Sequence, residues 1–263
     1  MADAVMVFAP TAMLTVTIER PADEVELHLH AGGPGVWPAR MIRSLGVPVT
    51  LCAAVGGEVG TVLRTLIEAE DGDARLVPRE GGSGWYVDDR RDGTRQRLVQ
   101  APGAPLGRHE LDELYGVALT AGLNAAVSVL SGPHFPSLVP EDVYRRLAAD
   151  LTGNGGRVVA DLSGSYVDAV LDGGGIEFLE VSEDDLVADG RRPDAPDEKQ
   201  IVAARWELHG RGARSALISR AELLALLDGE VVTVRPPALE EADHHGAGDS
   251  MTAGVRLSRR EST

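Results

Sequence analysis

Short apolar runs alternate with amphipathic stretches along most of the chain, and turn residues separate them. Short apolar runs are typical of buried strands, and amphipathic stretches are typical of helices that cover a sheet. The pattern predicts strands at 49–55, 126–132, 157–164, 177–182, 215–219 and 231–237. It predicts helices at 37–45, 59–69, 108–121, 141–151, after Tyr166, at 198–209, and after a final loop that ends near Gly248. We therefore expect an α/β fold with a mainly parallel sheet between helices.

Two segments depart from this alternation. Residues 13–19 and 24–30 alternate between apolar and polar side chains, as half-exposed strands do. Residues 85–100 contain Asp92-Gly93, a strong signal for a hairpin with a two-residue turn. We expect segments 13–30 and 85–100 to form a small β appendage over one edge of the sheet. The polar stretch 188–198 is expected to be a surface loop.

Length and composition narrow the class of protein. A chain of 263 residues with 43% hydrophobic and 25% charged residues fits one globular domain over 1–263. The net charge of −16 argues against nucleic acid as a partner. There is no run of about 20 apolar residues to span a membrane. Cys52 is the single cysteine, so no intrachain disulfide can form, and we expect a cytoplasmic protein.

Lysine and asparagine are almost missing from the sequence. Lys199 is the only lysine, and Asn124 and Asn154 are the only asparagines. No other position can therefore supply an ammonium group to a phosphate or a substrate.

The stretch 246–254, GAGDSMTAG, carries the clearest chemistry. Its small residues allow a tight turn in which backbone amides point the same way, and the helix that follows adds its positive dipole end. Such an anion hole suits a transferring phosphoryl group. Asp249 beside it is placed to accept a hydroxyl proton as a general base.

This stretch resembles the C-terminal signature of the ribokinase-like, phosphofructokinase-B (PfkB) type of sugar kinases. Further resembling motifs follow in the family's order over residues 13–255: AGGPGVWPAR (31–40), LGVPVTLCAAVGGEVG (45–60), DGTRQRL (92–98), SGPHFP (131–136), DLSG (161–164) and LEVSEDDL (179–186). Thr94-Arg95 and DLSG favour the phosphofructokinase branch.

The resemblance implies a ribokinase-like three-layer α/β/α sandwich with a β lid, which mediates a homodimer. It implies ATP- and Mg²⁺-dependent phosphoryl transfer to a hydroxyl of a sugar or sugar phosphate. By the same resemblance, Asp249 is the catalytic base, and the anion hole is formed by Gly246, Ala247 and Gly248. The implied ligand contacts are Gly32 and Gly33 to the sugar, Arg95 to a substrate phosphate, Ser182 and Ser219 to the nucleotide, and Asp185 to magnesium through water.

Several positions depart from the family pattern. Pro34 stands where the family usually has lysine, and Trp37 where it has asparagine, so Trp37 is expected to stack on a sugar or base. Glu180 replaces a second lysine, which reverses a charge, while Ser182 replaces an asparagine and Asp185 keeps a carboxylate. The stretch after residue 255 is short for the family, so we expect weak nucleotide binding unless an oligomer partner covers that side.

Two alternatives stay open: a nucleoside kinase, and a ligand-binding protein that keeps the kinase fold without activity. Smaller questions stay open as well. Arg95 either binds phosphate or belongs to an exposed, salt-bridged hairpin. Asp161 either contacts substrate or caps a turn, and Ser131 is a candidate phosphate or ribose contact. His28 and His30 are expected to face substrate or the lid in preference to binding metal.

Overall fold

The computed structural model describes residues 4–22, 24–70, 72–219, 223–227 and 230–234. Within them, the main sheet has the strand order β13-β12-β11-β10-β9-β8-β1-β4-β5, and all neighbours from β11 to β5 are parallel. Strands β12 and β13 join β11 in antiparallel fashion. The strands are β1 (Val5–Thr11), β4 (Val49–Gly56), β5 (Asp73–Arg79), β8 (Val127–Ser131), β9 (Val158–Asp161), β10 (Ile176–Ser182), β11 (Ala213–Ser219), β12 (Leu223–Leu227) and β13 (Glu230–Val234).

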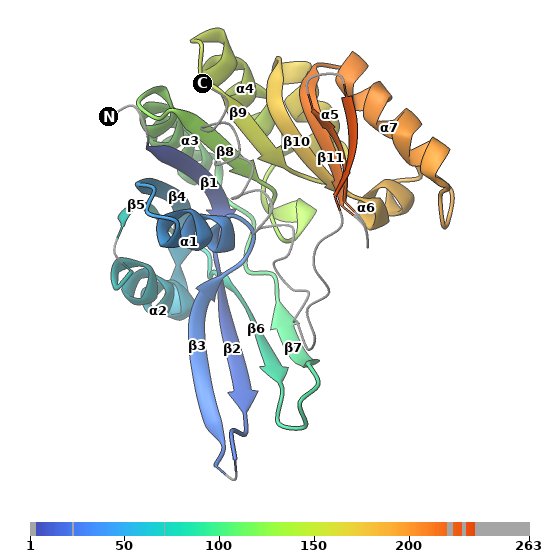
Figure 1. Cartoon of the computed structure of the whole chain (residues 1–263). Coiled ribbons are helices and arrows are strands. Elements are labelled where there is room, and N and C mark those ends of the chain that lie inside the picture. Colours follow the sequence, from blue (N-terminus) through green and yellow to red (C-terminus); the bar gives the residue numbers. More distant parts are fainter. Residues whose placement is uncertain (1–3, 23, 71, 220–222, 228–229, 235–263) are drawn as a thin grey trace.

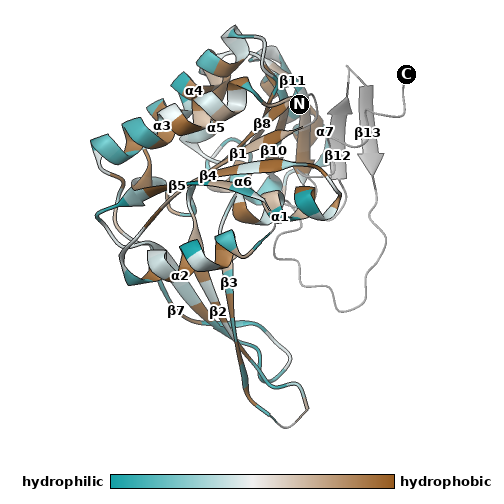
Figure 2. Ribbon diagram, turned by 90° about the vertical axis from the view of Figure 1, so that its left-hand side faces the viewer, coloured by the Kyte–Doolittle hydropathy of each residue, from teal (hydrophilic) through white to brown (hydrophobic). Residues whose placement is uncertain are grey.

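Helices cover both faces of this sheet (Figure 1). Neighbouring residues of β1 point to opposite faces, so Val7 enters one apolar core and Phe8 the other. The core around Phe8 is closed by α3 (Arg108–Leu123), α4 (Glu141–Gly153), α5 (Ser165–Gly173) and α7 (Glu198–Gly210). The core around Val7 is closed by α1 (Val36–Ser44) and α2 (Gly57–Glu68). Figure 2 shows hydrophobic colour concentrated in the central strands. The α/β sandwich predicted from the pattern is confirmed.

A second sheet, which we call the lid, extends from the carboxyl edge of the main sheet. Its order is β3-β2-β6-β7, with β2 (Met13–Glu19), β3 (Glu26–Gly32), β6 (Gly84–Asp89) and β7 (Gln96–Ala101). Strand β1 ends at Thr11 and β2 begins at Met13, so the chain passes directly from one sheet into the other. Figure 1 shows the lid projecting away from the main sheet. The predicted β appendage is therefore present.

Some local predictions were wrong or incomplete. Asp89 pairs with Gln96, so six residues connect β6 to β7 and the expected two-residue turn does not form. Strands β1, β5 and β12, together with the short helix α6 (Glu183–Ala188), were not predicted. Strand β5 contains Pro78, which fits only because β5 is an edge strand of the sheet. The predicted final helix and residues 235–237 lie outside the described residues.

Candidate active site

The carboxyl ends of the parallel strands define one edge of the main sheet. Ser131, Asp161, Ser182 and Ser219 are the last residues of β8, β9, β10 and β11, and the glycine loop 32–35 enters α1 beside the end of β1. Ligands of open parallel sheets bind outside the carboxyl ends of the strands. The topology therefore brings residues of four sequence motifs, together with Ser219, to one edge.

Glycine is required in the loop by close packing and by backbone conformation. Gly33 and Gly35 have φ angles of +93° and +83°. A Cβ atom on Gly35 would lie 2.5 Å from the Cβ of Ala9, and one on Gly32 would lie 2.5 Å from Oγ1 of Thr15. The loop therefore presses its backbone against β1 and the lid strand β2, where a side chain has no room.

Three buried hydroxyl groups next to this loop have no hydrogen-bond partner within the described part of the chain. They belong to Thr11, Thr15 and Ser131, whose exposed fractions are 3%, 3% and 0%. An unpaired buried hydroxyl costs about 1–3 kcal/mol, so such groups call for a partner. Ser131 was weighed from the sequence, whereas Thr11 and Thr15 were missed. Only their position beside the glycine loop identifies them.

Trp37 lies on α1 against the glycine loop. Its ring atoms come within 3.2 Å of the position that a Cβ on Gly32 would take. The guanidinium carbon of Arg40 lies 4.5 Å from the Trp37 ring centroid, in cation–π geometry. Arg40 also donates to the carbonyl of Ala31 at 2.9 Å and pairs with Glu70. The indole is therefore held in place, with one face occupied by Arg40.

Two arginines of the lid share one buried carboxylate. Arg95 donates from Nε to Oδ2 of Asp88 at 2.7 Å, and Arg97 pairs with Oδ1. The Asp88 side chain is fully buried. Burial opposes its ionisation, but hydrogen bonds from Arg97 and Arg95 outweigh burial and hold the Asp88 pKa below its ordinary value. Sequence reasoning missed Asp88 and considered Arg97 only as a neighbour of Arg95 in a salt-bridged hairpin, although an acidic residue on a predicted lid strand was a usable signal.

The polar face of the lid looks toward the main sheet. The Tyr86 ring lies 6.4 Å from that of His134, in the loop after β8, and Arg97 stacks on the Tyr86 ring at 3.9 Å.

His28 and His30 stack on each other with a centroid distance of 6.3 Å. Within the described ranges, no group of three or more His, Cys, Asp or Glu side chains is arranged to hold a metal.

On the other side of this edge, Ser182 and Asp185 lie together. The Ser182 hydroxyl caps α6 by accepting from the Asp185 amide at 3.0 Å, and it donates to Oδ2 of Asp185. Ser182 and Ser219 are register partners on β10 and β11. The structure therefore brings together the three residues that the resemblance assigned to nucleotide and metal.

Glu180 is buried two residues before Ser182, with 4% of its surface exposed. Its register partner on β9 is Asp161. Burial raises the pKa of Glu180 to about 9, and the neighbouring charge of Asp161 adds to the effect, while a hydrogen bond from Ser219 opposes it. Glu180 is therefore neutral near pH 7. The sequence predicted a negative charge where the family has lysine, and the structure corrects this prediction: the positive charge is lost, but no negative charge replaces it.

The remaining predicted residues, Gly246, Ala247, Gly248 and Asp249, lie outside the described residues. The part of the chain that is described holds no helix long and apolar enough to cross a bilayer.

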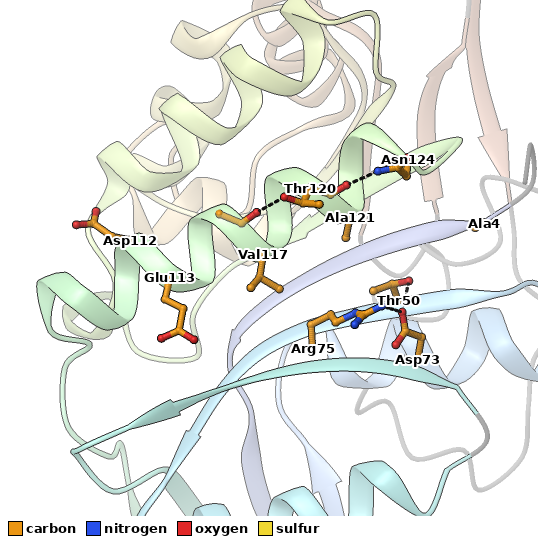
Figure 3. Close-up of a pocket in the computed structure, with 11 residues that line it drawn as sticks. Ala4, Thr50, Asp73, Arg75, Asp112, Glu113, Val117, Thr120, Ala121 and Asn124 are labelled. Atoms are coloured by element: carbon orange, nitrogen blue, oxygen red, sulfur yellow. Dashed lines mark hydrogen bonds and ion pairs between the residues drawn. The ribbon is translucent and has the colours of Figure 1, made fainter.

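A cavity of about 690 Å³ lies elsewhere, between α3 and the strands β1, β4 and β5 (Figure 3). In its wall, Ala4 directly precedes β1, and Thr50 and Asp73 stand at the amino ends of β4 and β5. Thr50 donates to Asp73 at 3.2 Å, and Arg75 pairs with the same carboxylate at 3.1 Å. The cavity is therefore separate from the site at the carboxyl ends.

Fold and site together define an α/β protein with a glycine loop and a β lid at the carboxyl edge of its parallel sheet, the edge where ligands of such sheets bind. Residues 11–260 match the description "pfkB family carbohydrate kinase". The chain belongs to the pfkB family of carbohydrate kinases.

Named relatives agree with this assignment. The ATP-dependent 6-phosphofructokinase isozyme 2 of Escherichia coli K12 is 29% identical over 235 residues, which cover 88% of this chain and 75% of that protein. The 1-phosphofructokinase of Xanthomonas campestris pv. campestris is 28% identical over 267 residues, covering 92% and 82%.

Solved structures agree as well. The tetrameric inhibited form of phosphofructokinase-2 from Escherichia coli aligns with a TM-score of 0.82 at 25% identity, covering 98% of this chain and 87% of that one. A ribokinase of Arabidopsis thaliana shares the fold, with a TM-score of 0.70 at 21% identity, covering 100% and 88%. The predicted ribokinase-like fold and the assignment as a phosphofructokinase-like sugar kinase that uses ATP are confirmed.

Proposed function

We propose that this protein transfers the γ-phosphoryl group of ATP to a hydroxyl of a phosphorylated sugar. The observation that carries the proposal is the pair Arg95 and Arg97, which Asp88 holds on the polar face of the lid. Guanidinium groups suit bidentate recognition of a phosphate. The unpaired hydroxyls of Thr11, Thr15 and Ser131 next to the glycine loop are suited to the hydroxyl groups of the sugar.

Each part of the site then has one task. Asp249 accepts the proton of the attacking hydroxyl, and the amides of Gly246, Ala247 and Gly248 stabilise the charge that develops on the phosphoryl group. Gly32 and Gly33 let the sugar approach the backbone, and Trp37 supports its ring.

Ser182 and Ser219 contact the nucleotide from the ends of β10 and β11. A carboxylate is the ligand type that Mg²⁺ prefers, so Asp185 fits a magnesium ion, held through water. Bound magnesium would neutralise phosphate charge during the transfer. The six-residue helix α6 presents Asp185 beside Ser182 for this purpose.

Trp37 also supports a nucleoside as a second candidate acceptor, because an indole at the glycine loop can stack on a base. The ring is held by Arg40 on one face, so a base would use the other.

We further propose that the protein is a homodimer assembled through the apolar face of the lid. On this face Val16 pairs with Leu29 and Val87, Ile18 pairs with Leu27, and Val87 pairs with Val99. Leu27, Leu29 and Val99 are 62%, 41% and 48% exposed. A contiguous apolar face of this kind marks an interaction surface. The opposite, polar face of the lid remains directed toward the candidate active site.

The test is a magnesium–ATP assay against sugars, sugar phosphates including fructose 6-phosphate and fructose 1-phosphate, and nucleosides. Asp249→Asn is expected to lose most transfer while its circular dichroism and melting temperature stay unchanged, and Asp194→Asn in the exposed loop serves as the matched control. Turnover by Asp249→Asn equal to that of the wild type would overturn the catalytic assignment. Ligand-induced thermal shifts without any transfer would instead identify a binding protein that keeps the fold.

A further inference from the structure

Glu180 and Asp161 form a carboxyl pair inside the nucleotide side of the site. They are register partners on the parallel strands β10 and β9, and a side-chain hydrogen bond joins them. Two ionised carboxylates have only acceptors, so this hydrogen bond requires a proton on one of them. Glu180 is the more buried of the two, at 4% exposure, and burial favours the neutral acid. The arrangement is therefore a protonated Glu180 that donates to the Asp161 carboxylate.

This pair is connected to the proposed nucleotide contacts. The Ser219 hydroxyl donates to Glu180, and Ser219 is the register partner of Ser182. Among the described residues, the charged groups that act on Glu180 are Asp161 on β9 and Asp185 on α6, and both are acidic. Loss of the proton would therefore add a negative charge next to two existing ones, at the position where a triphosphate would lie.

We propose that Glu180 is a positioning residue, which shares one proton with Asp161, holds Ser219 in place and keeps the charge at this edge low enough for ATP phosphates to bind. The inference rests on the proposed function, because that proposal assigns Ser182 and Ser219 to the nucleotide. It makes ATP affinity depend on pH through a group that does not touch the reacting atoms. Such a dependence would set an upper pH limit on ATP binding.

Glu180→Gln is the informative variant, because an amide keeps the hydrogen-bond donor and cannot ionise. In the wild type, the folded state keeps a proton that the unfolded chain releases near the ordinary glutamate pKa, so stability falls as pH rises from about 4.5 toward 9. The variant lacks this loss. Its melting temperature is therefore expected to exceed that of the wild type by an amount that grows from pH 5.5 to pH 9 and then levels off.

Glu177→Gln on the same strand is the matched control. Glu177 pairs with Arg157 at 3.4 Å and with Arg214 at 3.7 Å, so the variant removes a carboxylate outside the pair. Its melting temperature is expected to differ from that of the wild type by a constant amount over pH 6 to 9. If Glu180→Gln fails to fold, Asp161→Asn provides the same test, with a smaller growth of the difference because burial of Glu180 remains.

Nucleotide binding is read separately, from the melting-temperature shift that magnesium–ATP produces at pH 7 and at pH 9.5. We expect the wild type to bind about tenfold more weakly at the higher pH, and Glu180→Gln to bind nearly equally at both. A Glu180→Gln melting difference that is constant with pH, or an equal alkaline loss of binding in the variant, would overturn the inference. No transfer to any acceptor despite a normal shift overturns only the proposed function. No shift in the wild type at pH 7 overturns both.

Discussion

Arg95 donates a hydrogen bond from Nε to Oδ2 of Asp88 at 2.7 Å, and the Asp88 side chain has no exposed surface. Arg97 forms an ion pair with the other carboxylate oxygen of Asp88, Oδ1. Asp88 therefore fixes two cationic groups on the lid face that looks toward the glycine loop. If the lid arginines bind the substrate phosphate as proposed, lid stability and recognition of an anionic substrate depend on the same buried carboxylate.

Replacing Asp88 by Asn is expected to affect both properties. The amide keeps the shape but loses the charge-assisted bonds, which contribute about 1–3 kcal/mol when buried. We expect the free energy of unfolding in urea to fall by about this amount and KM for a sugar phosphate to rise more than kcat falls. Asp89→Asn, whose partner Arg91 is exposed, is the control and should change neither quantity appreciably. An unchanged KM in Asp88→Asn would show that the ion pairs of Asp88 do not contribute to substrate recognition.

The same carboxylate predicts how stability changes with pH. Because the folded pKa of Asp88 is lowered, its contribution is present above the ordinary value of 3.8 and is lost as pH falls through the folded pKa. The stability difference between wild type and Asp88→Asn should therefore be constant from pH 6 to 8 and shrink below about pH 4. Thermal melts in buffers of equal ionic strength measure it. A difference that persists at the lowest pH where the protein folds would contradict the assignment.

The two lid arginines can be ranked by substitution. Arg95→Ala and Arg97→Ala are each expected to raise KM for a phosphorylated sugar about 10- to 100-fold, as loss of a charge-assisted contact of about 1.5–3 kcal/mol does. Both should change KM for the unphosphorylated sugar much less. Arg91→Ala, which removes an exposed guanidinium from the same hairpin, is the control. Equal effects on both sugars would show that neither arginine reads the phosphate.

Gly35 and Gly93 have the same φ angle of +83° and different surroundings. A Cβ on Gly93 meets nothing within 4 Å, whereas one on Gly35 meets Ala9 at 2.5 Å. Gly93→Ala should therefore cost about 1–2 kcal/mol for the backbone conformation alone. Gly35→Ala should cost about 1–3 kcal/mol more through overpacking and should also weaken sugar binding. Urea denaturation of the two variants gives the comparison, and equal losses would refute the packing argument.

Polar substitution on the apolar face of the lid tests the dimer. Leu27→Ser combined with Leu29→Ser removes two exposed leucines, each worth about 1.5–3 kcal/mol when fully buried in an interface. The dissociation constant measured by sedimentation velocity should rise at least tenfold. Leu123→Ser, a 49% exposed leucine at the end of α3, should leave it unchanged. A wild type that sediments as a monomer at all concentrations would rule out the proposed assembly.

Strands with strong local patterns were readable from the sequence, and those without were not. The apolar run of β4 and the alternating run of β2 could each be predicted from the residues of the strand alone. Strand β5 was missed because charged residues interrupt its short apolar stretch and because it contains Pro78, both of which an edge strand tolerates. The wide hairpin loop at 90–95 was also hidden, because Asp92-Gly93 favours a tight turn and the pairing of Asp89 with Gln96 decides otherwise.

The sequence by itself determined the α/β class, the lid segments and the family, because periodicity and collinear motifs are properties of local stretches. It also located the glycine loop and the pair of Ser182 and Asp185, which are close along the chain. Only the tertiary structure decided which distant groups share one environment. Asp88 became the partner of two arginines, and Glu180 became a neutral acid against Asp161, because strand register and burial set their charge states. Those two quantities depend on the packed sheet and are absent from any single stretch of sequence.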